Sequence, residues 1–157
     1  MKDIRKAQRM LWLFGIFKIP MIGFVRPKIL EFTDKRMVVK IKLRRRTKNH
    51  LNSMYFGVLA VGADLSGAFQ AFAVAKERDR NISLAFKDFQ ANFIKRPESD
   101  VYFISEAGDF IGECVDETIR TKERVTKPIH VNAYVNYPEN PELVAEFTLG
   151  LSVKDKS

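Results

Sequence analysis

One long apolar stretch dominates the hydrophobic pattern of this chain. Residues 54–75 are almost all apolar or small, over a length that suits a central buried helix. Their single carboxylate, Asp64, shares a helical face with Gly57, Ala68 and Ala71, which are small and apolar. An ionised side chain on such a face is costly unless it is paired or solvated. Asp64 is therefore the first candidate functional residue.

Strands are predicted on both sides of this helix, mostly from alternation of apolar and polar residues. The first two form a hairpin with a turn at Asp34-Lys35 and a strongly basic outer face. The last two give the clearest alternation and are separated by the turn 138–141. The expected strands are residues 28–33, 37–43, 83–95, 101–104, 129–137 and 143–153.

Two more helices are expected. Residues 3–14 form an N-terminal surface helix, and residues 109–121 form a thinner helix with Asp109 as its N-cap. Ser53 is the expected N-cap of the central helix. The pattern predicts one α+β domain over residues 1–157, in which residues 1–20 are the N-terminal helix and its lead-in.

Composition excludes several classes of site. The single cysteine, Cys114, rules out an intramolecular disulfide and a Cys-rich zinc site, and it fits a reducing, cytoplasmic compartment as a buried thiol. The two histidines form no recognisable metal motif, so no metal is expected. The net charge of +8 favours an anionic partner. No nucleic-acid motif or aromatic stacking platform accompanies it, so nucleic acid is not the expected partner.

The N-terminus imitates a signal peptide, with a basic head followed by an apolar run. Lys18 and Pro20 interrupt the run, and no small-x-small cleavage site follows. The run is also too short to span a bilayer, so stable membrane insertion is not expected. Two alternatives stay open for this basic amphipathic segment: association with a membrane surface, or docking on the protein's own sheet.

The segment Asn49-His-Leu-Asn-Ser-Met-Tyr-Phe-Gly57, with Asp64 seven residues further on, resembles the start of the central helix in hotdog acyl-CoA thioesterases of the phenylacetate-pathway and thioesterase-superfamily-2 kind. Residues 91–97 resemble that family's next strand. The likeness is greatest to a thioesterase-like branch with an Asn-His-x-Asn and Phe-Gly-x-Leu pattern and largely without assigned function. Phe56 stands where the family has glycine. The resemblance implies a hotdog fold, in which a curved antiparallel sheet of five to six strands wraps the long helix.

The resemblance also implies a site. Asp64 would be the general base or the nucleophile, and the backbone N–H of Gly57 or Phe56 would bind the thioester oxygen. Asn49 would orient the water or the carbonyl, and His50 is also among the implied catalytic residues. No cofactor is implied beyond coenzyme A within the substrate, which is an acyl-CoA or acyl-carrier thioester. The implied substrate-binding residues are Tyr55, Arg45, Arg46, Lys48, Lys95 and Arg96, with Arg44 a further contact for the phosphates.

Other readings stay open. The spacing of His50 and Asp64 also fits a hydroxyacyl thioester dehydratase, whose Pro-rich motif is absent here. A non-catalytic module that binds acyl thioesters or lipids fits the Phe56 substitution. Structural roles are open too: a buried acid for Asp64, loop hydrogen bonding for Asn49, and a solvated strand end for the arginines. By analogy with the family, a homodimer or homotetramer is expected, with Asp64 of one chain facing Asn49 or His50 of the other.

Overall fold

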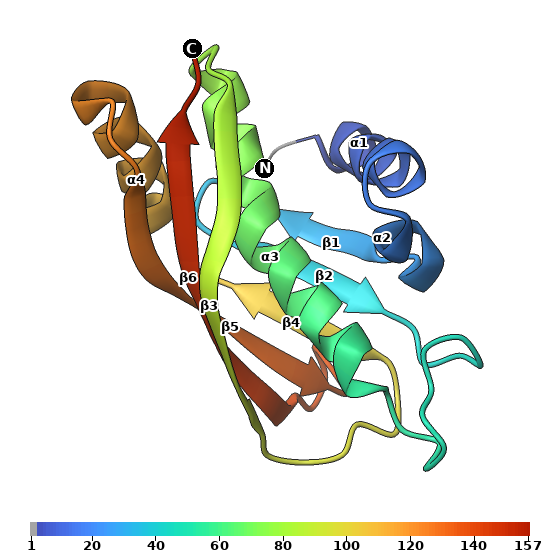
Figure 1. Cartoon of the computed structure of the whole chain (residues 1–157). Coiled ribbons are helices and arrows are strands. Elements are labelled where there is room, and N and C mark those ends of the chain that lie inside the picture. The colour runs from blue at the N-terminus through green and yellow to red at the C-terminus, as the bar shows by residue number, and fades with distance from the viewer. Residues whose placement is uncertain (1–2) are drawn as a thin grey trace.

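The computed structural model describes residues 3–157 and consists of four helices and one six-stranded sheet in this part of the chain (Figure 1). The strand order is β1-β2-β4-β5-β6-β3, and all neighbouring strands are antiparallel. The elements are α1 (Ile4–Phe17), α2 (Pro20–Val25), β1 (Lys28–Phe32), β2 (Met37–Ile41), α3 (Phe56–Glu77), β3 (Ile82–Phe93), β4 (Val101–Ser105), α4 (Gly108–Thr121), β5 (Val125–Val135) and β6 (Glu142–Asp155).

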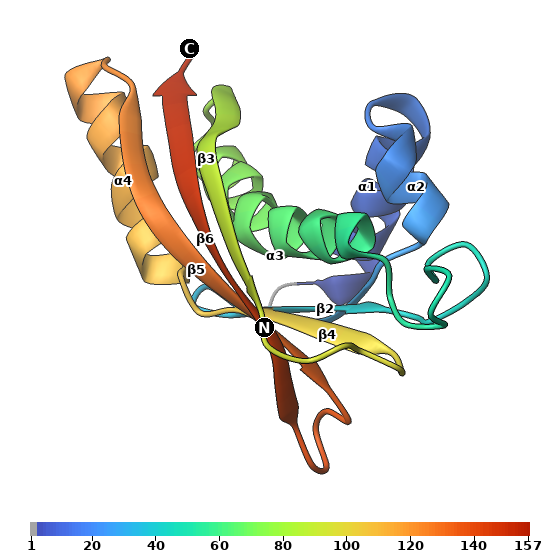
Figure 2. The ribbon, with the colours of Figure 1, turned by 60° about the horizontal axis from the view of Figure 1, so that its bottom comes forward.

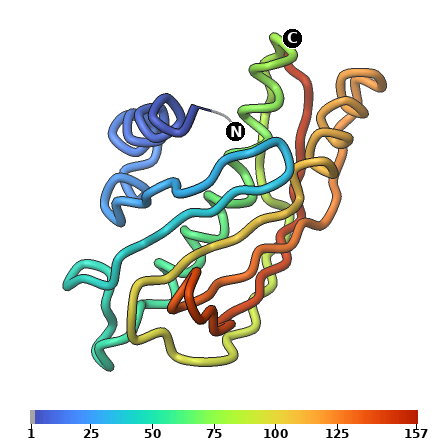
Figure 3. Tube along the Cα trace, turned by 180° about the vertical axis from the view of Figure 1, so that it is seen from behind, coloured from blue at the N-terminus to red at the C-terminus, as the bar shows by residue number. Residues whose placement is uncertain are grey.

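The sheet curls around α3, as expected from the sequence. Strands β2 and β4 pass beneath the helix, and β5, β6 and β3 rise along its flank (Figure 2). Seen from behind, the strands cross the helix obliquely (Figure 3). α4 packs against α3, β5 and β6, and α1 and α2 lie together at the opposite side of the molecule (Figure 1).

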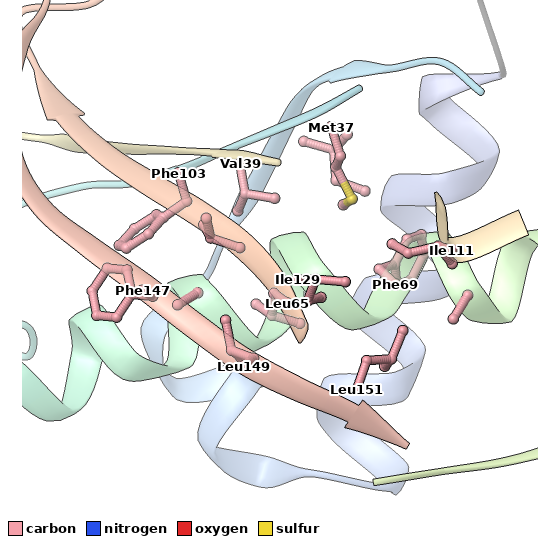
Figure 4. Close-up of a cluster of buried hydrophobic side chains, with 14 of the residues drawn as sticks. Met37, Val39, Leu65, Phe69, Phe103, Ile111, Ile129, Phe147, Leu149 and Leu151 are labelled. Atoms are coloured by element: carbon pink, nitrogen blue, oxygen red, sulfur yellow. The ribbon is translucent and has the colours of Figure 1, made fainter. Parts of the chain in front are cut away.

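The core lies between α3 and the concave face of the sheet. Leu65 and Phe69 of α3 meet side chains from β2, β4, β5 and β6 (Figure 4). The packing is close: a Cβ added to Gly62 would lie 2.3 Å from the Phe103 ring, and one added to Gly67 would lie 2.7 Å from Ile129. Side chains of the sheet occupy the space beside these helical glycines, so the glycines leave no open cavity along α3.

α3 passes the length and composition test for a membrane-spanning helix. Most of it is buried inside the sheet, as in the core helix of a soluble protein. The sheet covers one side of α3, α2 and α4 contact other sides, and Phe14 of α1 lies against Phe72, so the apolar character of α3 is explained by these contacts.

Both predicted N-caps are wrong. α3 begins at Phe56 with Tyr55 as its N-cap and no side-chain cap, while Ser53 is buried and donates its hydroxyl to Asn49 Oδ1 at 3.1 Å. α4 begins at Gly108, so Asp109 lies inside its first turn and pairs with Lys35. In both cases the chain turns into the helix at a point set by tertiary contacts rather than by the nearest capping residue.

The N-terminal region is more helical than expected. α1 starts where predicted, with Asp3 Oδ1 accepting hydrogen bonds from the backbone of Arg5 and Lys6, but it continues to Phe17. The six-residue α2 was not predicted, because so short a helix has no periodicity to detect. Pro20 fits its first turn, where a missing N–H costs nothing.

Candidate active site

The N-terminus of α3 presents free backbone donors. Val58 and Leu59 donate to the carbonyl oxygen of Tyr55, at 2.9 and 3.2 Å. The amides of Phe56 and Gly57 have no acceptor among residues 3–157, and no side chain caps them. Because α3 is 22 residues long, these amides lie at the positive end of a full helix dipole. The helix start can therefore stabilise a developing negative charge on a ligand oxygen.

Asp64 lies two turns further along the same face of α3. Its side chain is half-buried and makes no hydrogen bond or ion pair with any of residues 3–157. Burial without a partner raises the pKa of Asp64 from its ordinary value of 3.8 to about 6. A carboxylate in this state is poised to accept a proton near neutral pH.

Asp64 is expected to destabilise the folded chain at neutral pH. Its raised pKa means that the folded state holds the proton more tightly, so the cost is absent below pH 3.8, grows up to about pH 6 and is complete above it. Asp64→Asn should therefore raise the free energy of unfolding at pH 7.5 by up to about 3 kcal/mol. Urea unfolding from pH 3 to pH 8 measures this.

Glu113→Gln is the matched control for that experiment, because Glu113 is exposed on α4 and loses the same charge. The Asp64→Asn and wild-type stabilities should converge at low pH and separate above it. A constant difference across the pH range would mean that burial of the charge is not the cause.

The loop before α3 is organised by Asn49. Its Oδ1 accepts hydrogen bonds from the Leu51 amide at 2.9 Å, the Ser53 amide at 3.2 Å and the Ser53 hydroxyl at 3.1 Å. The oxygen is thus committed to the loop, while the Nδ2 group has no partner among the described residues. His50 is exposed in the same loop, without a hydrogen bond within the described chain.

The structure joins the two segments on which the sequence resemblance rests. The Met54 amide donates to Pro97 O at 2.9 Å, and the rings of Phe56 and Phe93 lie 6.4 Å apart, edge to face. Tyr55 folds over Gly57, where an added Cβ would lie 2.5 Å from its ring. Tyr55, Phe56 and Phe93 are each about half exposed, and they form an apolar rim around the helix start.

The rim continues into the sheet, which the sequence did not indicate. Phe147 of β6 is buried, and its ring lies 6.1 Å from Phe93 and 5.7 Å from Phe89. The register pairs Ala91 with Phe147, which places Phe89 and Phe93 on either side of it. The available signal was the shared alternation of strands 83–95 and 143–153, but only the pairing register fixes which rings meet.

The basic residues expected to bind substrate differ in whether their side chains already have a partner within the protein. Arg44, Arg45 and Lys48 are exposed and form no ion pair among residues 3–157. Arg46 donates to Phe24 O at 3.2 Å and lies over the Phe24 ring, so it joins the loop to α2. Lys95 and Arg96 pair with Glu142 and Glu98 respectively.

Asp64 lines none of five surface depressions of about 400 to 750 Å³ formed by residues 3–157. The depression of about 750 Å³ includes His130, Asn132 and Tyr134, which alternate with the core residues of β5 and so lie on the outer face of the sheet. No group of three potential metal ligands occurs among the described residues. Asp64 therefore lies outside each of these five depressions.

No protein-family model and no curated protein matches this sequence. Solved structures match it over nearly its whole length. A protein of unknown function from Chlorobaculum tepidum has a TM-score of 0.81 at 12% identity, with 96% of each chain covered. A candidate thioesterase from Shewanella oneidensis has a TM-score of 0.79 at 17% identity, covering 96% of this chain and 98% of that one. A thioesterase from Haemophilus influenzae has a TM-score of 0.66 at 13% identity, covering 99% and 92%.

At sequence identities this low, the comparison shows a shared fold only. A shared fold does not imply that the residues carry out the same chemistry. The long helix, the six-stranded antiparallel sheet and its curvature all match the expectation drawn from the sequence. This chain therefore has an α+β hotdog fold of the kind that thioesterases share.

Proposed function

We propose that this protein hydrolyses an acyl thioester, with Asp64 as general base or nucleophile. The observation that carries the proposal is the state of Asp64: half-buried, unpaired within the described chain, and with its pKa raised to about 6. It shares a helical face with the uncapped start of α3. A base near its working pH and a pair of free N–H donors are two of the elements that acyl transfer requires.

In the proposed reaction, the N–H groups of Phe56 and Gly57 of one chain hold the thioester carbonyl oxygen, and Asp64 of a second chain faces it. Asp64 takes a proton from the attacking water, or attacks the carbonyl carbon to give an anhydride that water then hydrolyses. In either route the thiol leaves, and the acyl group departs as a carboxylic acid. The free Nδ2 of Asn49 is proposed to orient the water or carbonyl, with His50 beside it.

Substrate binding is assigned to the rim and the basic loop. Tyr55, with Phe56 and Phe93, offers an apolar surface for the acyl part. Arg45 and Lys48 are free to meet phosphates of coenzyme A, and Arg44 adds to them. Arg46, Lys95 and Arg96 would first have to leave their present partners, so their share in phosphate binding is proposed to be smaller.

Helix geometry favours a site shared between two chains. Seven residues at 1.5 Å each place Asp64 about 10 Å along α3 from Gly57, a long reach for one thioester carbonyl. A second copy with α3 antiparallel would bring its helix start to Asp64. The outer edge of β3 is unpaired within residues 3–157, and Phe89 and Phe93 are exposed near it, which fits a homodimer or a homotetramer.

The test is a panel of short, aryl and long acyl-CoA thioesters, and an acyl-carrier thioester, followed by release of free thiol. We expect turnover of at least one class, in a protein that sediments as a dimer or tetramer. The panel should include a crotonyl thioester, whose enoyl absorbance reports the dehydratase reaction instead. A monomer at micromolar concentration would contradict the shared site.

The second candidate is a non-catalytic acyl-thioester or lipid-binding protein. The observation that favours it is Phe56, whose side chain stands at the helix start where the resembling thioesterases have glycine. Its ring contacts Tyr55 and Phe93 and narrows the approach to the N–H donors. Binding of an acyl-CoA without release of thiol from any member of the panel would select this function.

A further inference from the structure

The two N-terminal helices expose far more apolar surface than docking on the sheet explains. α1 and α2 form a helical hairpin, here called the hairpin. We define the hairpin face as its seven exposed large apolar residues: Trp12, Leu13, Ile16, Phe17, Ile19, Met21 and Phe24. Phe17 and Trp12 are 75% and 60% exposed. So many large apolar side chains exposed on two short neighbouring helices indicate an interaction site rather than ordinary surface.

The opposite side of the hairpin is fixed to the protein. Ala7, Leu11 and Gly15 are buried along one stripe of α1. Gln8 donates to Pro27 O at 3.1 Å and accepts from the Ile29 amide at 2.8 Å, which ties α1 to the start of β1. A Cβ on Gly15 would lie 2.7 Å from Gly23 N, so α1 and α2 touch backbone to backbone. The hairpin face is thus presented on a firmly docked support.

Cations surround the hairpin face. Between residues 4 and 30 the chain has no Asp or Glu. Arg5 and Arg9 precede Trp12 on the same helical stripe, and Arg46 lies over the Phe24 ring at 5.5 Å. The six basic residues of this segment are all exposed: Arg5, Lys6, Arg9, Lys18, Arg26 and Lys28.

Two grooves have the same combination of apolar walls and basic rims. A depression of about 620 Å³ lies between α1 and α2, with Trp12 and Ile16 in its lining and Arg26 beside them. A neighbouring one of about 510 Å³ is lined by Ile4 and Trp12 together with Arg5, Arg9 and Lys28. An apolar slot beside guanidinium and ammonium groups suits an acyl chain below a phosphate headgroup.

We infer that the hairpin face docks on the surface of an anionic lipid bilayer. Bulky apolar side chains enter the boundary between headgroups and acyl chains, and the surrounding cations meet lipid phosphates. A second copy of this chain, docked through its own hairpin face, is the less suitable occupant, because the pairing would bring two sets of six cations together and residues 4–30 contain no acid to compensate them.

Trp12 is the chain's one tryptophan, so its fluorescence reports directly on docking. We expect a blue shift of its emission, and cosedimentation, with vesicles of equal parts phosphatidylcholine and phosphatidylglycerol. Vesicles of phosphatidylcholine alone should bind much less, and added salt should weaken the interaction. Phe17→Glu should reduce partitioning about tenfold or more, because a carboxylate replaces a side chain that enters the membrane.

Phe110→Glu is the matched control, since it makes the same change on α4, away from the hairpin. It should leave vesicle binding within about twofold of wild type. Arg5→Gln with Arg9→Gln tests the charge separately and should remove most of the preference for anionic lipid. Unchanged Trp12 emission with anionic vesicles would overturn the inference. So would a Phe17→Glu protein that keeps wild-type vesicle binding but loses self-association, which would identify a second copy as the occupant.

Discussion

Asp64→Asn is expected to reduce kcat for thioester hydrolysis by about 10²–10⁴-fold, the usual contribution of a general base. The amide keeps the shape of the carboxylate but can neither accept a proton from water nor attack a carbonyl carbon. Because burial raises the pKa of Asp64 to about 6, the wild-type kcat/KM should rise with pH up to that value and level off above it. Release of thiol from the best acyl-CoA, measured from pH 5 to pH 8, provides both results.

Glu113→Gln again serves as the control and should keep wild-type rates, because this exposed side chain of α4 lies outside the proposed site. Residual activity of Asp64→Asn should lack the inflection near pH 6. A variant that hydrolyses the thioester at the wild-type rate would exclude Asp64 from the chemistry. Taken with its expected gain in stability, the substitution would show that the fold retains a destabilising charge for the sake of reactivity.

Gly108→Ala is expected to lower the free energy of unfolding by about 3 kcal/mol or more. A Cβ at this position would lie 1.9 Å from Asp34 O and 2.7 Å from Lys35 Cα. These are backbone atoms of the β1–β2 turn, so no side-chain rotation relieves the clash. The Gly108 amide also donates to Lys35 O at 3.0 Å, and this contact would be disturbed. Urea unfolding at neutral pH measures the change.

Gly112→Ala makes the same substitution one turn later in α4. Its added Cβ would meet nothing closer than Arg78 Nη2 at 3.8 Å. It should therefore stabilise the protein by up to about 1 kcal/mol, the ordinary gain from replacing a helical glycine. Equal effects of the two alanines would show that the close approach of α4 to the turn is not a constraint.

Predictions that rested on a repeated apolar pattern were confirmed, whereas predictions that rested on a single capping residue were wrong. Strand alternation predicted β5 and β6 well, because every second side chain reports on the same buried face. The pairing of β3 with β6 places Phe89, Ala91 and Phe93 on one face of β3. The buried thiol of Cys114 was likewise confirmed.

The capping predictions failed for a nonlocal reason. Ser53 has the right chemistry for an N-cap, but its hydroxyl is used by Asn49, and the loop is held against Pro97 by the Met54 amide. The helix begins only after that contact. An N-cap side chain stabilises a helix start by only about 1 kcal/mol, so tertiary contacts can override it.

The amino-acid sequence by itself determined the order of elements apart from α2, the buried faces of the strands and the place of Asp64 as the one carboxylate on the small, apolar face of the central helix, because each follows from local periodicity. Tertiary structure decided what surrounds each residue. It left Asp64 unpaired within the described chain, engaged Asn49 Oδ1 in the loop and gathered Phe56, Phe93 and Phe147 beside the helix start. It also turned Trp12, Phe17 and Phe24 outward. The sequence pattern does not distinguish an apolar residue in the core from one that faces solvent, because burial depends on segments that are distant along the chain.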